Sequence, residues 1–384
     1  MTRDQIEEQG IEQLHRLTGV KWTRDEPDVI PAWVADMDLK PPPVVVDAIR
    51  AVIDRNDFGY NRQASAQLAD TFTAWQRSQH GWSPDPGRVR TFCDVLHAID
   101  VALWLHTEPG DGVVLLTPIY HPFLMAVNNS GRRVVDVPLD PEGFGLDPER
   151  LRAAIDSGTK AILMCNPHNP TGRVFTEQEL RAIGEVAIEN DLLLLSDEVW
   201  ADLVYPGATH IPTESLGPEV AAKTITISAA SKAFNLAGMR CAVAHFGHDG
   251  LNRQFEELPT HFLGAVSTTG AEATMAAWTA GGPWLASLLR HLAERRDQLT
   301  ARLAAELPAV GYQPPQATYL GWLDFRALEL GPDPTERLLA DGRIALSPGP
   351  AFGPPGVGHA RVNFATSASI LDELIDRMVK VAGG

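Results

Sequence analysis

Short apolar runs alternate with helical patterns through the middle of this chain, and this alternation constrains the fold more than any other feature. Five runs have the length and composition of buried strands: 113–116, 161–165, 192–195, 224–227 and 241–246. Between the second and third, Thr176 and Glu179 form a capping box ahead of apolar residues at helical spacing, which predicts a helix over 176–190. Such alternation is typical of βαβ units, so we expect an α/β fold with a mostly parallel sheet.

The pattern changes near Pro283, which indicates a second unit. From there the sequence predicts a long helix over 284–307, strands at 319–325 and 360–365, and a final helix. The Pro/Gly-rich stretch 347–358 is typical of an active-site loop rather than a linker. A chain of 384 residues suits about two domains. We expect a large domain at 46–282, a small domain at 283–384, and an N-terminal segment, 1–45, that joins the small one.

Composition narrows the classes of function. The chain has 49 acidic and 32 basic residues, which argues against nucleic acid or an anionic membrane as the main partner. The N-terminus has no signal-peptide pattern, and no run of about 18 apolar residues occurs, so we expect a soluble cytoplasmic protein with a small-molecule substrate. Cys93, Cys165 and Cys241 lack metal-ligand spacing. We therefore expect no metal site, and predict that all three are small buried residues.

One lysine stands out by its position. Among the six lysines, Lys232 follows an apolar strand, whereas the others lie towards the termini or at the beginning of predicted strands. In open α/β sheets ligands bind outside the carboxyl ends of the strands. A partly desolvated lysine there can condense with a carbonyl compound. From this segment alone, a surface lysine in a loop is an equally good interpretation.

Two further strand ends carry polar groups. NPHNPTG (166–172) follows the strand at 161–165, and Asp197 follows the strand at 192–195. A pyridoxal phosphate site needs an anchoring lysine, a carboxylate for the ring nitrogen, a donor for the phenolic oxygen and groups that hold the phosphate. The chain supplies Lys232, Asp197, Asn169 and Arg240 in these roles. A lone carboxylate after a strand is usually a cap, but the four together favour a cofactor site.

At this point the chain resembles the fold-type I aminotransferase superfamily and, within it, the MalY/PatB-type cystathionine β-lyases, or C–S lyases. The resemblance covers nearly the whole length, on PAWVADMD (31–38), FGYNR (58–62), EPGDGVVLLTPIYHPF (108–123), NPHNPTG, SDEVWADLVYPGATHIP (196–212) and SKAFNLAGMR (231–240). WVADMD and DLVYPGATHIP are the motifs more specific to the lyases. The resemblance implies a large domain with a mostly parallel seven-stranded sheet between helices, a smaller α+β domain, pyridoxal 5′-phosphate as cofactor, and a homodimer with a shared active site.

The resemblance also implies roles for single residues around the reacting atoms. Lys232 is similar to the lysine that binds the cofactor's aldehyde and later moves the Cα proton. Asp197 resembles the partner of the ring nitrogen, and Asn169 the donor to the phenolic oxygen. Tyr120 is expected to stack on the ring, although a loop-end tyrosine is often simply packed. Arg361 is similar to the arginine that clamps the substrate's α-carboxylate through two hydrogen bonds; a surface arginine on a strand is the alternative.

The phosphate is expected at the start of the helix that follows Asp94, where backbone N–H groups of Val95 and Leu96 suit an anion. Ser231 and Arg240 complete the expected cradle, and Tyr60 resembles a tyrosine that reaches the phosphate from the neighbouring subunit. The substrate is expected to contact Trp33, Ala35, Tyr120, Asn169 and Arg361.

Several positions depart from the family pattern. Trp200, expected beside the cofactor, stands where the lyases usually have histidine and the aminotransferases tyrosine. An indole N–H donates a hydrogen bond but cannot accept one. Ala229 stands where a phosphate-binding serine is common. We expect His97 and His121 to be packed or solvated, and Trp75, Trp82 and Trp104 to serve the core or subunit contacts.

Three functions remain open at this stage. The favoured one is α,β-elimination from cystathionine or another cysteine S-conjugate to thiol, pyruvate and ammonia. The second is an aminotransferase, or a tailoring enzyme that acts on an S-conjugated amino acid by transamination or oxidative deamination. The third, a non-catalytic regulatory binding protein, is disfavoured by the intact Lys232, Asp197, Asn169 and Arg361.

Overall fold

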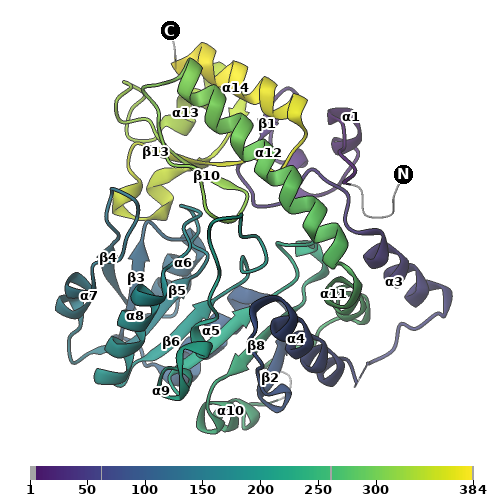
Figure 1. Cartoon of the computed structure of the whole chain (residues 1–384), viewed down its shortest axis with the longest axis vertical. Helices are drawn as coiled ribbons and strands as arrows, with labels where there is room; N and C mark the ends of the chain where they lie inside the picture. Colours follow the sequence, from purple (N-terminus) through teal and green to yellow (C-terminus); the bar gives the residue numbers. More distant parts are fainter. Residues whose placement is uncertain (1–5, 62, 260–261, 383–384) are drawn as a thin grey trace.

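The computed structural model describes residues 6–61, 63–259 and 262–382 (Figure 1). Its central element is a seven-stranded sheet with the order β2-β8-β7-β6-β5-β3-β4. The strands are β2 (Val89–Phe92), β3 (Gly112–Thr117), β4 (Arg133–Pro138), β5 (Thr159–Cys165), β6 (Leu193–Asp197), β7 (Thr224–Ser228) and β8 (Ala242–Phe246). Neighbouring strands are parallel from β4 to β7, and β8 is antiparallel to both β7 and β2. The mostly parallel α/β fold is thus confirmed.

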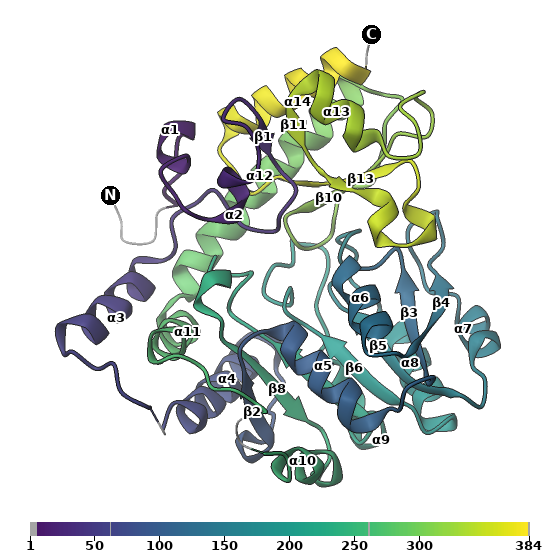
Figure 2. The same ribbon diagram turned by 180° about the vertical axis from the view of Figure 1, so that it is seen from behind.

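Helices cover both faces of this sheet (Figures 1 and 2). They are α4 (Ala64–His80), α5 (Val95–His106), α6 (His121–Asn129), α7 (Pro148–Ala154), α8 (Glu177–Glu189), α9 (Pro218–Ala221), α10 (Asp249–Glu256) and α11 (Thr268–Ala280). Alternate residues of one strand belong to different cores: Val114 packs in the cluster that holds α8, and Val113 in the one that holds α5. α8 begins at the predicted capping box of Thr176 and Glu179.

A smaller antiparallel sheet lies over the carboxyl ends of the parallel strands (Figures 1 and 2). Its order is β12-β13-β10-β9, formed by β9 (Gly311–Tyr312), β10 (Leu320–Asp324), β12 (Ser347–Pro348) and β13 (His359–Asn363). The accompanying helices are α12 (Gly282–Glu306), α13 (Pro334–Gly342) and α14 (Ala368–Ala382). Short 3₁₀ turns occur at Pro86–Arg88, Thr213–Leu216, Ala237–Met239, Gly349–Phe352 and Pro354–Gly356.

The N-terminal segment contacts both units. It contains α1 (Ile11–Leu14), α2 (Val20–Thr23), β1 (Ile30–Pro31) and the first residues of α3 (Pro43–Asp54), which crosses the predicted boundary at 45/46. β1 pairs in parallel with β11 (Ile344–Ala345), whereas α3 packs on α11. The boundaries at 45/46 and 282/283 stay predictions. In the described part of the chain, no helix combines the length and apolar character needed to span a bilayer.

Candidate active site

Three parallel strands deliver polar side chains to one cavity of about 180 Å³ at their carboxyl ends. Asn169 follows β5, Asp197 ends β6 and Lys232 follows β7, and all three line the cavity. These are the polar residues that the sequence places after predicted strands. The structure brings them together at the edge of the sheet where such folds bind ligands.

Lys232 is partly buried and held by the N-terminal segment. Its Nζ donates a hydrogen bond to the Ala35 carbonyl oxygen at 3.0 Å and lies 5.7 Å from the centre of the Trp200 ring. Burial lowers the pKa of Lys232; Asp36 opposes this effect, and Arg361 adds to it. A lowered pKa leaves more of the amine neutral, which both condensation with an aldehyde and proton abstraction require.

Asn235 connects this lysine loop to the WVADMD motif. Its Oδ1 accepts a hydrogen bond from Met37 N at 3.1 Å, and its Nδ2 donates to Leu39 O at 2.9 Å. In the same motif, the buried Asp38 carboxylate accepts from Lys21 Nζ at 2.8 Å and Trp22 Nε1 at 2.7 Å. The motif thus fixes the Ala35 carbonyl that Lys232 meets.

Asp197 is a buried carboxylate whose negative charge is only weakly compensated by its neighbours. Its Oδ1 accepts a hydrogen bond from Val199 N at 3.1 Å. Burial raises the pKa of Asp197 to about 7, against the opposing effects of that N–H, Cys165 and Lys232. A carboxylate in this state is stabilised by a cation that reaches into the cavity, because the cation keeps it ionised. Asp197 therefore fits the protonated ring nitrogen of pyridoxal phosphate.

The neighbouring Glu198 has a structural role. Its Oε1 accepts from Thr213 N at 2.9 Å, and its Oε2 pairs with His210 Nε2 at 3.0 Å. Glu198 does not line the cavity. Of the two adjacent carboxylates, Asp197 alone is available to a ligand there.

Arg361 is a buried cation without a carboxylate partner among the described residues. Its guanidinium donates to Asn169 Oδ1 at 2.9 Å, to Trp33 O at 2.7 Å and to Ser347 Oγ at 3.0 Å. Burial lowers its pKa to about 10, so it stays charged at neutral pH. These neutral acceptors leave the positive charge uncompensated, which suits an anionic ligand group.

The start of α5 forms an anion cradle. The first N–H groups of a helix have no partner within it. Val95 and Leu96 occupy this position and line the cavity, as do Ser231 and Arg240. Arg240 Nη2 pairs with Asp94 Oδ2 at 2.5 Å. These residues fit a phosphate, while Ala229 adds no hydroxyl to the wall.

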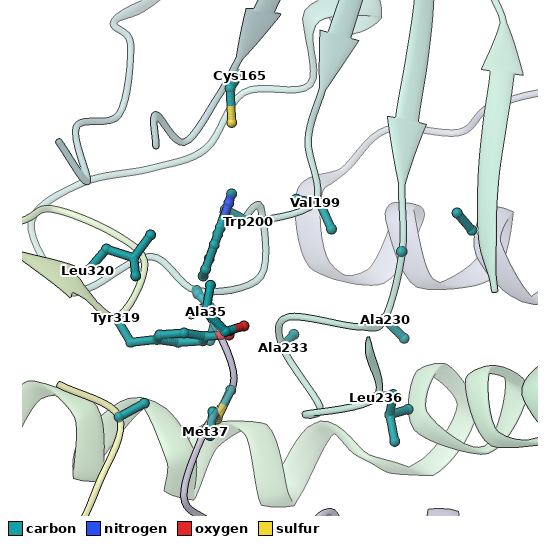
Figure 3. Packing of buried hydrophobic residues seen from close by; sticks show 14 of the residues in the cluster. Ala35, Met37, Cys165, Val199, Trp200, Ala230, Ala233, Leu236, Tyr319 and Leu320 are labelled. Carbon is teal, nitrogen blue, oxygen red and sulfur yellow. The ribbon is translucent and has the colours of Figure 1, made fainter. Parts of the chain in front are cut away.

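Aromatic side chains shape the interior. Figure 3 shows the Trp200 ring between Cys165 and Tyr319, with the Tyr319 hydroxyl beside Ala35. The Trp200 and Tyr319 rings meet edge to face at 4.9 Å, and Tyr319 Oη donates to Ala35 O at 2.8 Å. Tyr120, at the start of α6, also lines the cavity. Burial raises its pKa, so its hydroxyl stays neutral.

Other expected residues lie differently. Trp33 contributes its backbone carbonyl to Arg361, whereas its ring stacks under Arg24 at 3.9 Å. Tyr60 is fully exposed and lines a separate surface hollow, away from the cavity of its own chain. The predicted packing of His121 is found: its ring lies 5.3 Å from Tyr120, and burial lowers its pKa to about 4.

Of the remaining candidates, His97 packs edge to face on Phe92, and Trp75 and Trp82 are buried. Trp104 is half exposed against Phe262, outside the core.

The prediction that all three cysteines are buried is wrong for Cys93. This residue follows β2 and is partly exposed at the wall of the cavity, because the ladder with β8 has ended there. Cys165 and Cys241 are buried as predicted. Sequence reasoning also missed Val199, Ala237 and Cys241 as lining residues, since nothing in their chemistry marks them as ligand contacts.

The chain matches known proteins over most of its length. The family model of aminotransferase class I and II matches residues 34–378. A protein named putative cystathionine beta-lyase from Mycobacterium tuberculosis is 40% identical, over 98% of both chains. Cystathionine beta-lyase PatB from Bacillus subtilis is 35% identical, over 91% of this chain and 92% of that protein.

A solved structure agrees with these sequence matches. The crystal structure of a putative PLP-dependent beta-cystathionase from Corynebacterium diphtheriae has a TM-score of 0.94 with 31% identity, over 99% of both chains. The geometry of Lys232, Asp197 and the α5 cradle fits the same cofactor. The chain therefore belongs to the class I and II aminotransferase family of fold-type I pyridoxal phosphate enzymes, in its C–S lyase branch.

Proposed function

We propose that this protein is a carbon–sulfur β-lyase that cleaves cystathionine or related cysteine S-conjugates into thiol, pyruvate and ammonia. The observation that carries the proposal is one cavity lined by Lys232, Asp197 and Asn169, where the Asn169 amide oxygen accepts a hydrogen bond from the uncompensated Arg361. These residues can hold an amino acid by its carboxylate while a base removes the proton from its Cα. The names of the relatives support elimination from a sulfur substrate.

Pyridoxal phosphate, when bound, supplies an aldehyde that condenses with the substrate's amine and a ring that takes up electrons from Cα. Asp197 would face the ring nitrogen, and Asn169 would donate to the phenolic oxygen. Val95, Leu96, Ser231 and Arg240 would hold the phosphate, with Tyr120 and Trp200 beside the ring.

Arg361 orients the substrate through its α-carboxylate. The guanidinium is fixed by Trp33 O and Ser347 Oγ, so its position is set before substrate arrives. Lys232 then removes the Cα proton with its neutral amine, whose pKa burial has lowered. Loss of that proton allows a thiolate to leave from Cβ, because a thiolate is a good leaving group.

The test is the set of products formed without any keto acid. Elimination needs no second substrate, so thiol, pyruvate and ammonia should be released in equal amounts from an S-conjugated amino acid.

Trp200 departs from the pattern of both the lyases and the aminotransferases, and this departure keeps a second class of reaction as the alternative. Its indole N–H can donate a hydrogen bond but cannot accept one, unlike the histidine or tyrosine usual at this position. An aminotransferase, or a tailoring enzyme that deaminates an S-conjugate oxidatively, is therefore the second candidate. Both would use Lys232 and Arg361 in the same way.

The site is proposed to be shared within a cytoplasmic homodimer. Tyr60 is fully exposed and does not line the cavity of its own chain, which suits a contact with the partner's phosphate. Mixing inactive Tyr60→Ala and Lys232→Ala chains should restore activity, because one site of each mixed dimer has both groups intact. After complete exchange we expect about a quarter of the wild-type sites to work.

Verified exchange of subunits without recovered activity would contradict this shared site. Mixing two preparations that both carry Lys232→Ala, one of them also Tyr60→Ala, is the control and should restore nothing.

A further inference from the structure

Two thiols face each other across the ends of β2 and β8. Cys93 directly follows β2 and Cys241 directly precedes β8. These strands are antiparallel, and their last paired residues are Phe92 and Ala242. The ladder ends there; one further step in the same register would set Cys93 opposite Cys241, and the Cys93 thiol is close enough to Cys241 to contribute to raising its pKa.

The two segments also stay in contact beyond the cysteines. One residue beyond each cysteine, the side chains of Asp94 and Arg240 are joined by an ion pair of 2.5 Å. The two cysteines thus lie between the backbone pair Phe92–Ala242 and the ion pair Asp94–Arg240. Opposite residues in antiparallel pairs have Cα atoms about 4.5–5.5 Å apart. Disulfides need about 4.4–6.8 Å, so a continuation of this register would bring the two cysteines within reach of one.

Both side chains face the same space. Cys93 and Cys241 line the cavity together with Val95 and Arg240 of its anion cradle. Cys165, the third cysteine, is buried at the end of β5 and does not line the cavity. Its Sγ lies 3.2 Å from the Pro167 carbonyl oxygen.

The two thiols differ in accessibility. Cys93 is partly exposed, with its Sγ 4.0 Å from the Ala265 carbonyl oxygen. Cys241 is buried, and burial raises its pKa to about 11. Oxidants in solution therefore meet Cys93 first, and Cys241 stays a protonated thiol until a neighbouring oxidised sulfur is available to it.

We propose that Cys93 and Cys241 form a redox-sensitive thiol pair whose disulfide closes the anion cradle to the cofactor phosphate. With hydrogen peroxide, the Cys93 sulfur attacks the O–O bond and becomes a sulfenic acid, releasing one water. The Cys241 sulfur then displaces the hydroxyl of the sulfenic acid, and a second water leaves with the S–S bond formed. Two thiols thus lose two protons and two electrons, and one peroxide becomes two waters.

The disulfide ties the residue before Asp94 to the residue after Arg240. It places two joined sulfur atoms at the wall where Val95 and Arg240 meet an anion, and restrains the cradle from adjusting to a phosphate. A bound cofactor, in turn, shields the pair from peroxide. The inference rests on the cofactor assignment of this cavity, and it is independent of the reaction class.

The experiment treats holoenzyme and cofactor-free full-length protein with a limited amount of peroxide, then maps cysteines by alkylation and mass spectrometry. We expect one linked peptide pair, Cys93 with Cys241, reversed by dithiothreitol, while Cys165 stays reduced. Excess pyridoxal phosphate should slow the linkage about tenfold or more. The oxidised protein should bind the cofactor at least about tenfold more weakly than the reduced protein.

Matched variants separate this pair from general oxidation. Cys93→Ser and Cys241→Ser should form no linked pair, and peroxide should leave their cofactor affinity close to that of the untreated variant. Cys165→Ser should form the same linkage as the wild type. Absence of the Cys93–Cys241 peptide, linkage through Cys165, or linkage without loss of cofactor affinity would overturn the proposal. If the linkage forms but the reduced protein binds no cofactor, the cofactor assignment fails instead.

Discussion

Lys232→Ala is expected to lose turnover by several orders of magnitude, because the variant lacks both the covalent anchor for the cofactor and the base at Cα. Borohydride reduction of the wild-type holoenzyme followed by peptide mapping should place the reduced cofactor on Lys232. Lys223→Ala is the matched control, since Lys223 forms a surface ion pair with Asp191 and should be dispensable. A reduced adduct on any of the other five lysines would refute the assignment.

Arg361→Ala is expected to weaken substrate binding by about 2–5 kcal/mol, the usual cost when a buried charge pair loses one partner. This corresponds to a rise in KM of roughly 30-fold to several thousand-fold. Arg361→Lys should recover only part of the loss, because an ammonium cannot donate two parallel hydrogen bonds to a carboxylate. KM for S-conjugates measures the effect, with the exposed Arg326→Ala as the control variant.

A second comparison separates carboxylate binding from damage to the fold. Arg361 also binds Asn169 and Ser347, so its loss removes structural contacts as well. Amines that lack the α-carboxylate should bind the wild type and Arg361→Ala with similar affinity. A large loss for these amines too would show that the arginine acts through the structure of the site rather than on the carboxylate.

The central strands were predictable because they are buried on both faces and form continuous apolar runs. The edge strands β2 and β4 were missed for the opposite reason. In β4, exposed Arg133 and Asp136 interrupt the buried Val135 and Val137, so no apolar run stands out. Half-buried strands of this kind are recognised by pairing with a neighbour, which one sequence does not show.

The residues of the candidate site likewise fall into those that the sequence predicts and those that it does not. Lys232 and Asp197 were accessible to sequence reasoning, because each follows a strand and the strand ends of a parallel sheet converge. The surroundings of Arg361 were not, since Trp33 and Asn169 are remote from it in sequence and meet it only through the fold. The exposure of Cys93 depends on where the β2–β8 ladder ends, which composition does not encode. The role of Tyr60 depends on a partner chain and stays a prediction.

The most direct test of the proposed reaction counts turnovers in the absence of keto acid. Holoenzyme is incubated with L-cystathionine, L-cystine or an S-alkyl cysteine, and thiol, ammonia and pyruvate are measured over time, with Lys232→Ala as the blank. Elimination restores the cofactor's aldehyde, so a β-lyase should release equal amounts of the three products over many turnovers per site. Two results would contradict it: activity that stops after one equivalent and resumes only with a keto acid, or ammonia release with oxygen uptake and no free thiol.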